Sequence, residues 1–373
     1  MRSLDDLGAQ PAAWLSGEGE RADVVLSSRV RLARNVARHL YPQRADADQH
    51  QEVVDLIHAA ADKTGITHAG SFFESGQIDE FTRDLLIERH LISVEFLRDD
   101  RPRGLFVADD EATAAMINEE DHLRIQAVTS GMNIREAMGM ATRIDDAFGS
   151  VIEYDTDPRL GYLTACPTNV GTGMRASVLI HLPGLVLTRD MDNVLAQVSK
   201  IGLTVRGFYG EGSDVLGNLF QISNQTTLGR SEDDLLESLE KVSKQLITYE
   251  EEARARLFRD APYQIKDKIW RALGILALAR VLTSDEVMNL LSAVRLGVAV
   301  KVINGVDFSL LNELLLTSQR AHLQRIMRRR MAAEERDVAR AKIIRERLWP
   351  AIRQLENVEH EPPAKDEHDE ETP

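Results

Sequence analysis

The chain has 373 residues, of which 43% are hydrophobic and 28% charged. This balance excludes wholesale disorder, and the length gives room for two or three domains with a sizeable core. Sixty acidic against 45 basic residues give a net charge of −15, which argues against generic nucleic-acid binding but leaves room for local basic patches. The lone Cys166, the absence of a signal-peptide pattern and the absence of any membrane-length apolar run predict a soluble, cytoplasmic protein.

The first two thirds of the chain predict a mixture of strands and helices. Residues 1–22 are small and polar and are expected to form an N-terminal arm. Residues 47–64 carry one apolar stripe, which predicts a helix. From about 91 to 225 the chain contains short β-branched or alternating runs, with Gly, Asp or Pro near most of their ends, which predict strands. Helices are expected to interrupt them at 133–147, with Asn133 as the cap of a capping box, and at about 190–201.

Because few helices separate the strand-like runs, antiparallel pairing is favoured over βαβ winding. After Ser231 long amphipathic helices continue to about residue 355, and the last 18 residues carry eight acids against one lysine, which predicts disorder. The expected fold class is therefore α+β, with a mostly antiparallel central sheet flanked by helices and then an all-helical C-terminal domain. The expected divisions are an arm (1–22), a catalytic domain (23–255), a helical domain (256–355) and an acidic tail (356–373).

Five arginines adjoin Gly-rich turns or strand ends in the first block. Arg29 and Arg31 are two residues apart, so in a strand both would project from one face and could grip one polyanion. Any one of the five is more typical of a surface charge, but together with Arg124, Arg175 and Arg206 they predict a cage for phosphates. Such a cage suits ATP, because phosphoryl transfer depends on electrostatics and positioning. Walker and protein-kinase motifs are absent, and the strand-like run after "GTGMRA" excludes a dinucleotide fold.

Acidic residues supply the complementary chemistry. The segment "MINEEDHLRIQ" at 116–126 holds three carboxylates between apolar residues. A guanidinium is a poor nucleophile until it loses a proton, and a carboxylate can both hold it and accept that proton. Glu120, and Glu211 in "GFYGEG", are candidates for this role, although an exposed acidic turn explains them equally well. Cys166 is either a small buried hydrophobe or a thiolate that pairs with a cationic substrate.

Four segments, "SSRVRLARN", "NEEDHLRIQ", "CPTNVGTGMRASV" and "VRGFYGEG…FQISNQ", resemble the signature segments of the guanidino (phosphagen) kinases, in the same order across about residues 24–254. The resemblance implies that Glu120 is the catalytic carboxylate, Glu211 its partner and Cys166 the active-site cysteine. It implies ATP with Mg²⁺ held mainly by phosphates and water, so that no dedicated metal ligands are expected. The ATP-binding residues it implies are Ser27, Ser28, Arg29, Val30, Arg31, His90, Arg124, Arg175, Ala176, Ser177, Val178, Leu179, Arg206, Gly207, Phe208, Tyr209, Gly210 and Glu211.

The choice of guanidine follows from the ends of the matching segment. Phosphagen kinases carry a helical N-terminal domain that helps enclose free arginine or creatine, whereas only 23 residues precede the match here. A site without that cover is expected to admit an arginine still attached to a protein. This arrangement, together with the opening "WLSGEGERADVVLSSRVRLARN" and the additional helical domain, is similar to the bacterial protein-arginine kinases of the McsB type. That resemblance implies phosphoarginine as a degradation mark for the Clp unfoldase–protease, a zinc-binding activator protein, and a homodimer.

The helical domain carries a second candidate site. In "EERDVARAKIIRERL", Arg336 and Arg340 would share one helical face with Asp337 nearby, which suits the two charged groups of phosphoarginine. From the spacing alone, a solvated charged helix or one that binds nucleic acid is the better explanation. "RDVARA" resembles the allosteric phosphoarginine-binding motif of protein-arginine kinases, which implies a site formed by Arg336, Asp337, Val338, Ala339, Arg340 and Ala341. The apolar stripe Ile265, Ile269, Leu273 and Leu276 fits either a dimer interface or a core.

Three functions are therefore open at this point. The first is an ATP-dependent protein-arginine kinase. The second is a kinase of free arginine or another small guanidine, which the short N-terminal segment disfavours. The third is a non-catalytic adaptor that binds phosphoarginine, which Glu120, Glu211 and Cys166 disfavour.

Overall fold

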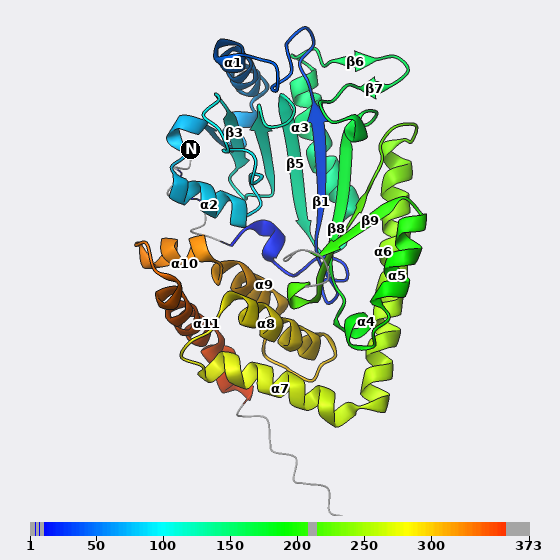
Figure 1. Ribbon diagram of the computed structural model, residues 1–373, viewed down its shortest axis with the longest axis vertical. Coiled ribbons are helices and arrows are strands. Elements are labelled where there is room, and N and C mark those ends of the chain that lie inside the picture. Colours follow the sequence, from blue (N-terminus) through cyan, green and yellow to red (C-terminus); the bar gives the residue numbers. More distant parts are fainter. Residues whose placement is uncertain (1–3, 5–6, 8–10, 208–214, 356–373) are drawn as a thin grey trace, which may run out of the picture.

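The computed structural model describes residue 4, residue 7, residues 11–207 and residues 215–355. An eight-stranded sheet forms its centre, in the order β2-β3-β4-β5-β1-β8-β10-β9, and every neighbouring pair is antiparallel (Figure 1). The strands are β1 (Val25–Arg34), β2 (Gly70–Glu74), β3 (Gly104–Ala108), β4 (Thr113–Ile117), β5 (Leu123–Ser130), β8 (Met174–His181), β9 (Leu203–Gly207) and β10 (Leu219–Asn224). The α+β prediction with an antiparallel sheet is confirmed.

Helices cover one face of this sheet. They are α1 (Ala47–Thr64), α3 (Ile134–Gly149) and α6 (Glu232–Asp260). Val30 and Leu32 of β1 alternate with Arg29 and Arg31 and point into this core, with exposed fractions of 0% and 1%. Hydrophobic burial on one side of the central strands therefore forces the intervening arginines to the other side.

The ends of these helices follow local sequence signals, with one exception. Capping boxes begin α1 at Asp46 and α6 at Ser231. The capping box expected at Asn133 is wrong: its side chain makes no cap hydrogen bond and donates to the Ser130 carbonyl oxygen at 2.9 Å instead. Asn133 thus stabilises the turn that leaves β5.

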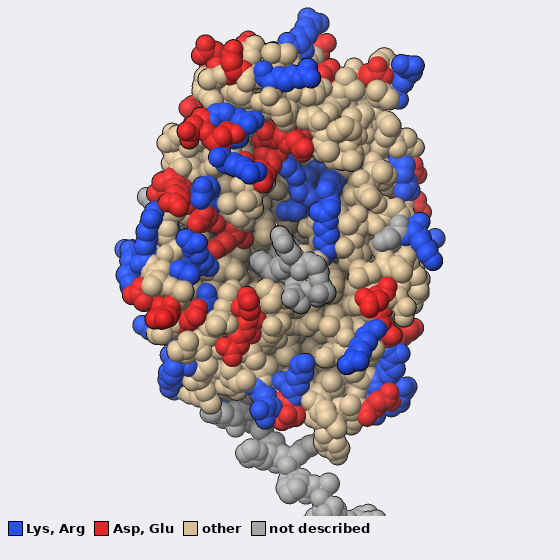
Figure 2. Space-filling view, viewed as in Figure 1, with Lys and Arg blue, Asp and Glu red and all other residues tan. Residues whose placement is uncertain are grey.

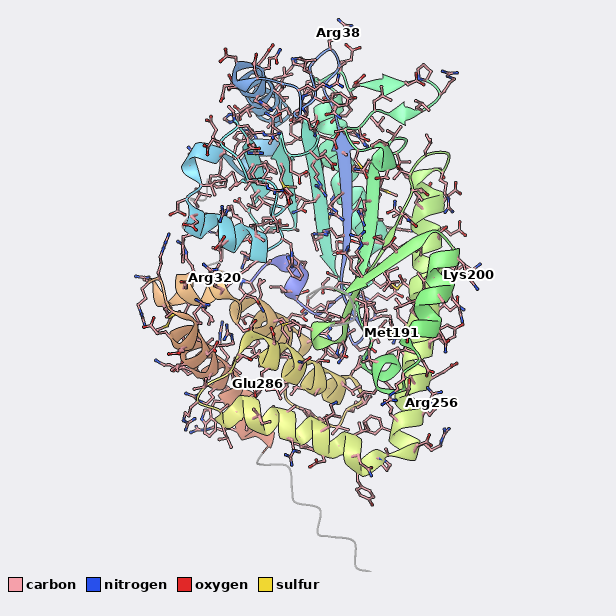
Figure 3. All side chains as sticks on the ribbon, viewed as in Figure 1. Arg38, Met191, Lys200, Arg256, Glu286 and Arg320 are labelled. Carbon is pink, nitrogen blue, oxygen red and sulfur yellow. The ribbon has the colours of Figure 1, made fainter. Side chains whose placement is uncertain are left out.

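Smaller elements complete the first part of the chain. A two-stranded hairpin comprises β6 (Thr156–Asp157) and β7 (Gly161–Tyr162), and the short helices are α2 (Glu80–Glu88), α4 (Pro183–Leu187) and α5 (Met191–Lys200). Single turns of 3₁₀ helix lie at η1 (Ala13–Leu15), η2 (Ile66–Ala69), η3 (Ser75–Gln77), η4 (Pro167–Asn169) and η5 (Leu216–Asn218). Figure 3 labels Met191 and Lys200 at the two ends of α5, and Arg256 of α6, which forms an ion pair with Asp190 just before α5.

The C-terminal part is entirely helical and lies below the sheet in Figure 1. It contains α7 (Pro262–Leu278), α8 (Ser284–Ala299), α9 (Phe308–Thr317), α10 (Arg320–Met327) and α11 (Ala333–Leu355). The apolar stripe Ile265, Ile269, Leu273 and Leu276 is buried in the core of this region. Helix α6 continues five residues past the expected domain boundary at 255, and Pro262 opens α7. The expected acidic tail lies outside the described residues.

Buried polar contacts join the helical region to the sheet region. The Nε2 atom of His181, at the end of β8, lies 2.8 Å from the Ser292 hydroxyl of α8. The Glu88 carboxylate of α2 accepts the backbone N–H groups of Ala321 and His322 at 2.7 and 3.0 Å, and so caps α10. At the surface, Arg320, labelled in Figure 3, begins α10 and lies 4.0 Å from Asp84 of α2. Within residues 11–207 and 215–355, no helix combines the length and apolarity that crossing a membrane requires.

Candidate active site

The strand register places all five arginines on the open face of the sheet. Arg31 of β1 lies opposite both Arg175 of β8 and Gln126 of β5, and Arg124 is two residues from Gln126. Directly opposed residues of antiparallel strands share a face, and so do residues two apart along a strand. The same rule extends to the edge of the sheet, because Arg206 of β9 lies opposite Gln221 of β10, which lies opposite Leu179 of β8.

The guanidinium groups disturb one another electrostatically. Burial, together with the nearby charges of Arg124 and Arg175, lowers the pKa of Arg29 to about 10. Burial and the nearby charges of Arg29, Arg124 and Arg175 also lower the pKa of Arg31 well below its usual value. Figure 2 shows Lys and Arg side chains gathered in the hollow at the centre of this face. Like charges held this close favour the binding of a polyanion, because it relieves their repulsion.

Glu119 holds one of these arginines in place. Its carboxylate lies 2.6 Å from Arg124 Nη1, and it also accepts hydrogen bonds from the Ser93 hydroxyl at 2.5 Å and from the Glu120 backbone N–H at 3.0 Å. Burial alone would raise the pKa of Glu119, but Arg124 and these hydrogen bonds together lower it. Glu119 is therefore an anion that orients Arg124, a role that the sequence did not reveal.

Glu120 has a different environment from its neighbour. It is half-buried, and burial together with the charges of Asp121 and Glu119 raises its pKa. The Gln43 side chain fixes its backbone by donating to the Glu120 carbonyl oxygen at 2.6 Å. A carboxylate whose pKa is raised binds a proton more readily than an ordinary one, which suits a general base.

The remaining polar residues of this segment hold the surrounding loops. One Asp121 oxygen accepts from Asn35 at 2.6 Å and from the Ala165 backbone N–H at 2.7 Å. This second bond ties the loop that carries Cys166 to the acidic segment. His122 Nδ1 accepts the Val36 N–H at 3.1 Å, so Nε2 carries the proton donated to a carbonyl 2.9 Å away.

Cys166 lies on this tethered loop and is partly exposed. Its Sγ atom is 3.0 Å from the Thr168 hydroxyl. The negative form of Cys166 raises the pKa of Arg175, against the larger lowering effects of burial and of the other arginines. The cysteine therefore borders the arginine cluster, and the interpretation of Cys166 as a fully buried hydrophobe does not apply.

A cavity that is open to solvent adjoins the cluster. Five of the expected ATP-binding residues line it, namely Ser27, Arg29, His90, Ser177 and Leu179, and so do Trp14, Val128 and Gln221. Other expected residues are buried away from it: the Ser28 hydroxyl donates to the Gly131 carbonyl oxygen, and the Val30, Ala176 and Val178 side chains lie in the core beneath the sheet. The expectation for Phe208, Tyr209, Gly210 and Glu211 concerns positions outside the described residues, whereas Gly207 ends β9.

The described part of the chain holds no cluster of three His, Cys, Asp or Glu side chains suited to a metal ion.

The family model "ATP:guanido phosphotransferase, C-terminal catalytic domain" matches residues 52–253, and that for the "Protein-arginine kinase McsB C-terminal domain" matches residues 262–361. A protein-arginine kinase of Symbiobacterium thermophilum is 44% identical over 90% of this chain and 96% of its own length, and that of Brevibacillus brevis is 43% identical over 90% and 94%. The chain belongs to the protein-arginine kinase family.

Solved structures of guanidino kinases share the fold of this protein-arginine kinase family member. A lombricine kinase has a TM-score of 0.57 and 27% identity, with 66% of this chain and 72% of that chain covered. A taurocyamine kinase of Schistosoma mansoni also has a TM-score of 0.57, with 21% identity over 77% of this chain and 40% of that one, which shows the fold alone.

The "RDVARA" segment lies on α11, within the part that matches the protein-arginine kinase C-terminal domain. Arg340 is buried, and it donates from Nε to the Ser318 carbonyl oxygen and from Nη1 to the Leu282 carbonyl oxygen, both at 2.8 Å. It also forms an ion pair with Asp337. Arg336 Nη1 donates to the Met331 carbonyl oxygen at 2.8 Å. Val338 is exposed, whereas Ala339 and Ala341 are buried, so only part of the motif faces solvent.

Proposed function

We propose that this protein transfers the γ-phosphoryl group of ATP to the guanidinium group of arginine side chains in proteins. The observation that carries the proposal is that one segment places a phosphate-binding arginine and a candidate base, a glutamate, next to each other. Glu119 orients Arg124 within the arginine cluster, and the next residue, Glu120, has a raised pKa. The 44% identical relative from Symbiobacterium thermophilum, which carries the name protein-arginine kinase, supports the same reaction.

Each group has a defined part in the proposed reaction. The arginine cluster binds the phosphates of MgATP, the substrate, and stabilises charge on the γ-phosphoryl group as it moves. Glu120 accepts a proton from the substrate guanidinium while the freed nitrogen attacks phosphorus. The new N–P bond forms as the bond from phosphorus to the β–γ bridging oxygen breaks, which releases ADP. Glu211 is proposed to hold the guanidinium from the other side, and Cys166 to border it.

Replacement of the base tests this assignment. Glu120→Gln keeps the size of the side chain but removes its ability to accept the proton, so phosphoarginine formation should fall about 10²–10⁴-fold. ADP affinity should not weaken, because a negative charge beside the phosphates is removed. Glu153→Gln, an exposed glutamate of the same domain, is the matched control. Turnover of Glu120→Gln within about threefold of the control, measured by mass spectrometry under non-acidic conditions, would refute the base assignment.

The nature of the acceptor needs its own experiment. Reaction with ATP and either free arginine or an arginine-containing protein, followed by mapping of the phosphate, separates the proposed activity from that of a small-guanidine kinase. Phosphate on the protein alone supports the proposal. An adaptor that only binds phosphoarginine would transfer phosphate to neither.

We also propose that phosphoarginine binds at the "RDVARA" segment. Arg336 is the member of the motif that can best reach a ligand, since Arg340 is already bound to backbone carbonyls. Arg336→Ala should weaken phosphoarginine binding and leave basal kinase activity unchanged. Unchanged phosphoarginine affinity, measured by calorimetry, would contradict this site.

A homodimer is proposed on the outer side of α7. Tyr263, Trp270 and Leu278 lie on this side with exposed fractions of 83%, 45% and 67%. Exposed apolar groups in a row are typical of protein contacts. Trp270→Glu should shift the protein toward monomer in sedimentation velocity, and an unchanged sedimentation coefficient would exclude this surface. We also propose, from the resemblance, that the protein is cytoplasmic. We propose further that it acts with the Clp unfoldase–protease and a zinc-binding activator protein.

A further inference from the structure

The N-terminal arm forms one wall of the cavity beside the arginine cluster. Trp14 of η1 lines this cavity together with His90, and their ring centroids are 5.9 Å apart with planes inclined by 52°. Arg29 lines the same cavity from β1. The cavity therefore has an aromatic wall and a basic one, and it opens to solvent beside the arginine cluster.

His90 lines this cavity with an imidazole ring that is uncharged at neutral pH. Its backbone has a φ of 60°, in the left-handed region, at the turn that follows α2, and its carbonyl oxygen accepts a hydrogen bond from Gln126 at 2.7 Å. Burial, with the nearby charges of Arg29 and His322, lowers its pKa to about 3. At neutral pH the imidazole is uncharged, so it suits an aromatic base better than a phosphate.

The helical region holds the other side of the arm. Trp14 and Leu15 share an apolar cluster with Leu316 of α9. Asn312 of α9 donates to the Leu15 carbonyl oxygen at 3.1 Å and accepts from Arg295 of α8 at 2.7 Å. Arg295 in turn donates to the carbonyl oxygen at residue 22 at 2.6 Å. Two buried side chains of the helical region thus bind the arm on both sides of its glycine-containing turn.

We propose that Trp14 stacks on the nucleobase of ATP, and that Arg295 and Asn312 are positioning residues that hold it there. This inference rests on the proposed function, because it places the base beside the phosphates that the arginine cluster binds. Aromatic stacking contributes free energy to any base and none to a bare phosphate chain. The helical region would then contribute to nucleotide affinity without contacting the nucleotide itself.

The comparison of ADP with inorganic tripolyphosphate tests the stacking role. Calorimetry on full-length Trp14→Leu should show ADP binding weakened about tenfold, in line with loss of one stacked base, and tripolyphosphate binding unchanged. Trp14→Phe should restore most of the ADP affinity. Trp349→Phe, at an exposed tryptophan of α11, is the matched control and should bind both ligands like the original protein.

Positioning has a separate readout. Asn312→Ala should weaken ADP binding and spare tripolyphosphate, as Trp14→Leu does, whereas a general loss of folding would weaken both. With Trp270 and Trp349 replaced by Phe, the fluorescence of the remaining Trp14 should be quenched by ADP and not by tripolyphosphate, which tests the contact even if Trp14→Leu fails to fold. Unchanged fluorescence with ADP bound, or equal ADP affinity in Trp14→Leu, would overturn the inference. If the original protein binds neither ligand, the proposed ATP site itself is wrong.

Discussion

The buried ion pair between Arg34 and Asp145 leads to a quantitative prediction about the free energy of unfolding. Arg34 ends β1 with 1% of its side chain exposed, and its Nη2 lies 2.6 Å from the Asp145 carboxylate of α3. Its Nη1 donates to the carbonyl oxygen of Thr172 at 2.9 Å, and its guanidinium carbon lies 3.5 Å from the centroid of the Tyr162 ring. The pair therefore ties β1 to α3, which packs on one face of the sheet, and to the loop that leads into β8.

Asp145→Asn should destabilise the protein strongly, because it leaves the Arg34 charge buried beside a neutral amide. Removing one partner of a buried pair costs about 3–5 kcal/mol. Glu232 lies 4.0 Å from the same guanidinium and offsets part of the loss, so the lower end, about 3 kcal/mol, is expected. The double variant Arg34→Met/Asp145→Leu should cost less than the two single changes added together, because no charge remains buried.

Urea unfolding followed by far-ultraviolet circular dichroism measures these costs. The four proteins of the cycle, namely the original chain, Arg34→Met, Asp145→Leu and the double variant, give the coupling free energy directly. A cost below about 1 kcal/mol for Asp145→Asn, the range of exposed ion pairs, would refute the reasoning. So would single costs that simply add in the double variant.

Three further predictions concern pH, backbone crowding and the motif on α11. Burial lowers the pKa of His122 to about 4, below the value in the unfolded chain. The contribution of His122 to stability is therefore complete above about pH 6.5 and falls by about 1.4 kcal/mol per pH unit toward pH 4. The urea midpoint of His122→Gln should drop less on acidification than that of the original protein. Gly19→Ala places a methyl 1.9 Å from a strand carbonyl oxygen and should destabilise the protein by about 1–3 kcal/mol. Gly274→Ala on α7, where the added methyl meets nothing within 4 Å, should stabilise it by up to about 1 kcal/mol. Equal melting temperatures of the two variants would contradict this contrast. Arg340→Met leaves two backbone carbonyls without their donor and should lower stability by about 2–4 kcal/mol, whereas Arg336→Met should lower phosphoarginine affinity with little loss of stability; the reverse pattern in denaturation and calorimetry would refute the division of roles.

The parts of this fold that the sequence predicts are those governed by local periodicity. The two-residue spacing of Arg29 and Arg31 against Val30 and Leu32 is enough to assign one polar and one buried face to β1, and the register extends that assignment to its neighbours. The chain from Gly70 to Glu88 was not predicted to contain a strand and a helix, because its apolar residues are few and its helix is short. The helix is supported instead by contacts with α10, which lies more than 200 residues further along the chain.

Candidate-site residues divide in the same way. Glu120 could be proposed from the sequence because it lies within a recognisable segment, whereas Trp14 lies in a stretch that looks like a polar arm. Its burial comes from Leu316 and Val128, which no local pattern connects to it. The Asn133 cap was wrong for a related reason, since the preceding turn competes for the same side chain.

The contacts that His181 and Ala22 make with the helical region also affect how the chain can be divided. Two family models meet near residue 260, which suggests two separable modules. Yet Ser292 and Arg295 reach across that division to bind polar groups of the sheet region in buried positions. A fragment ending at α6 would expose those groups to water together with the apolar surface around them, so the amino-terminal portion expressed by itself should be prone to aggregation.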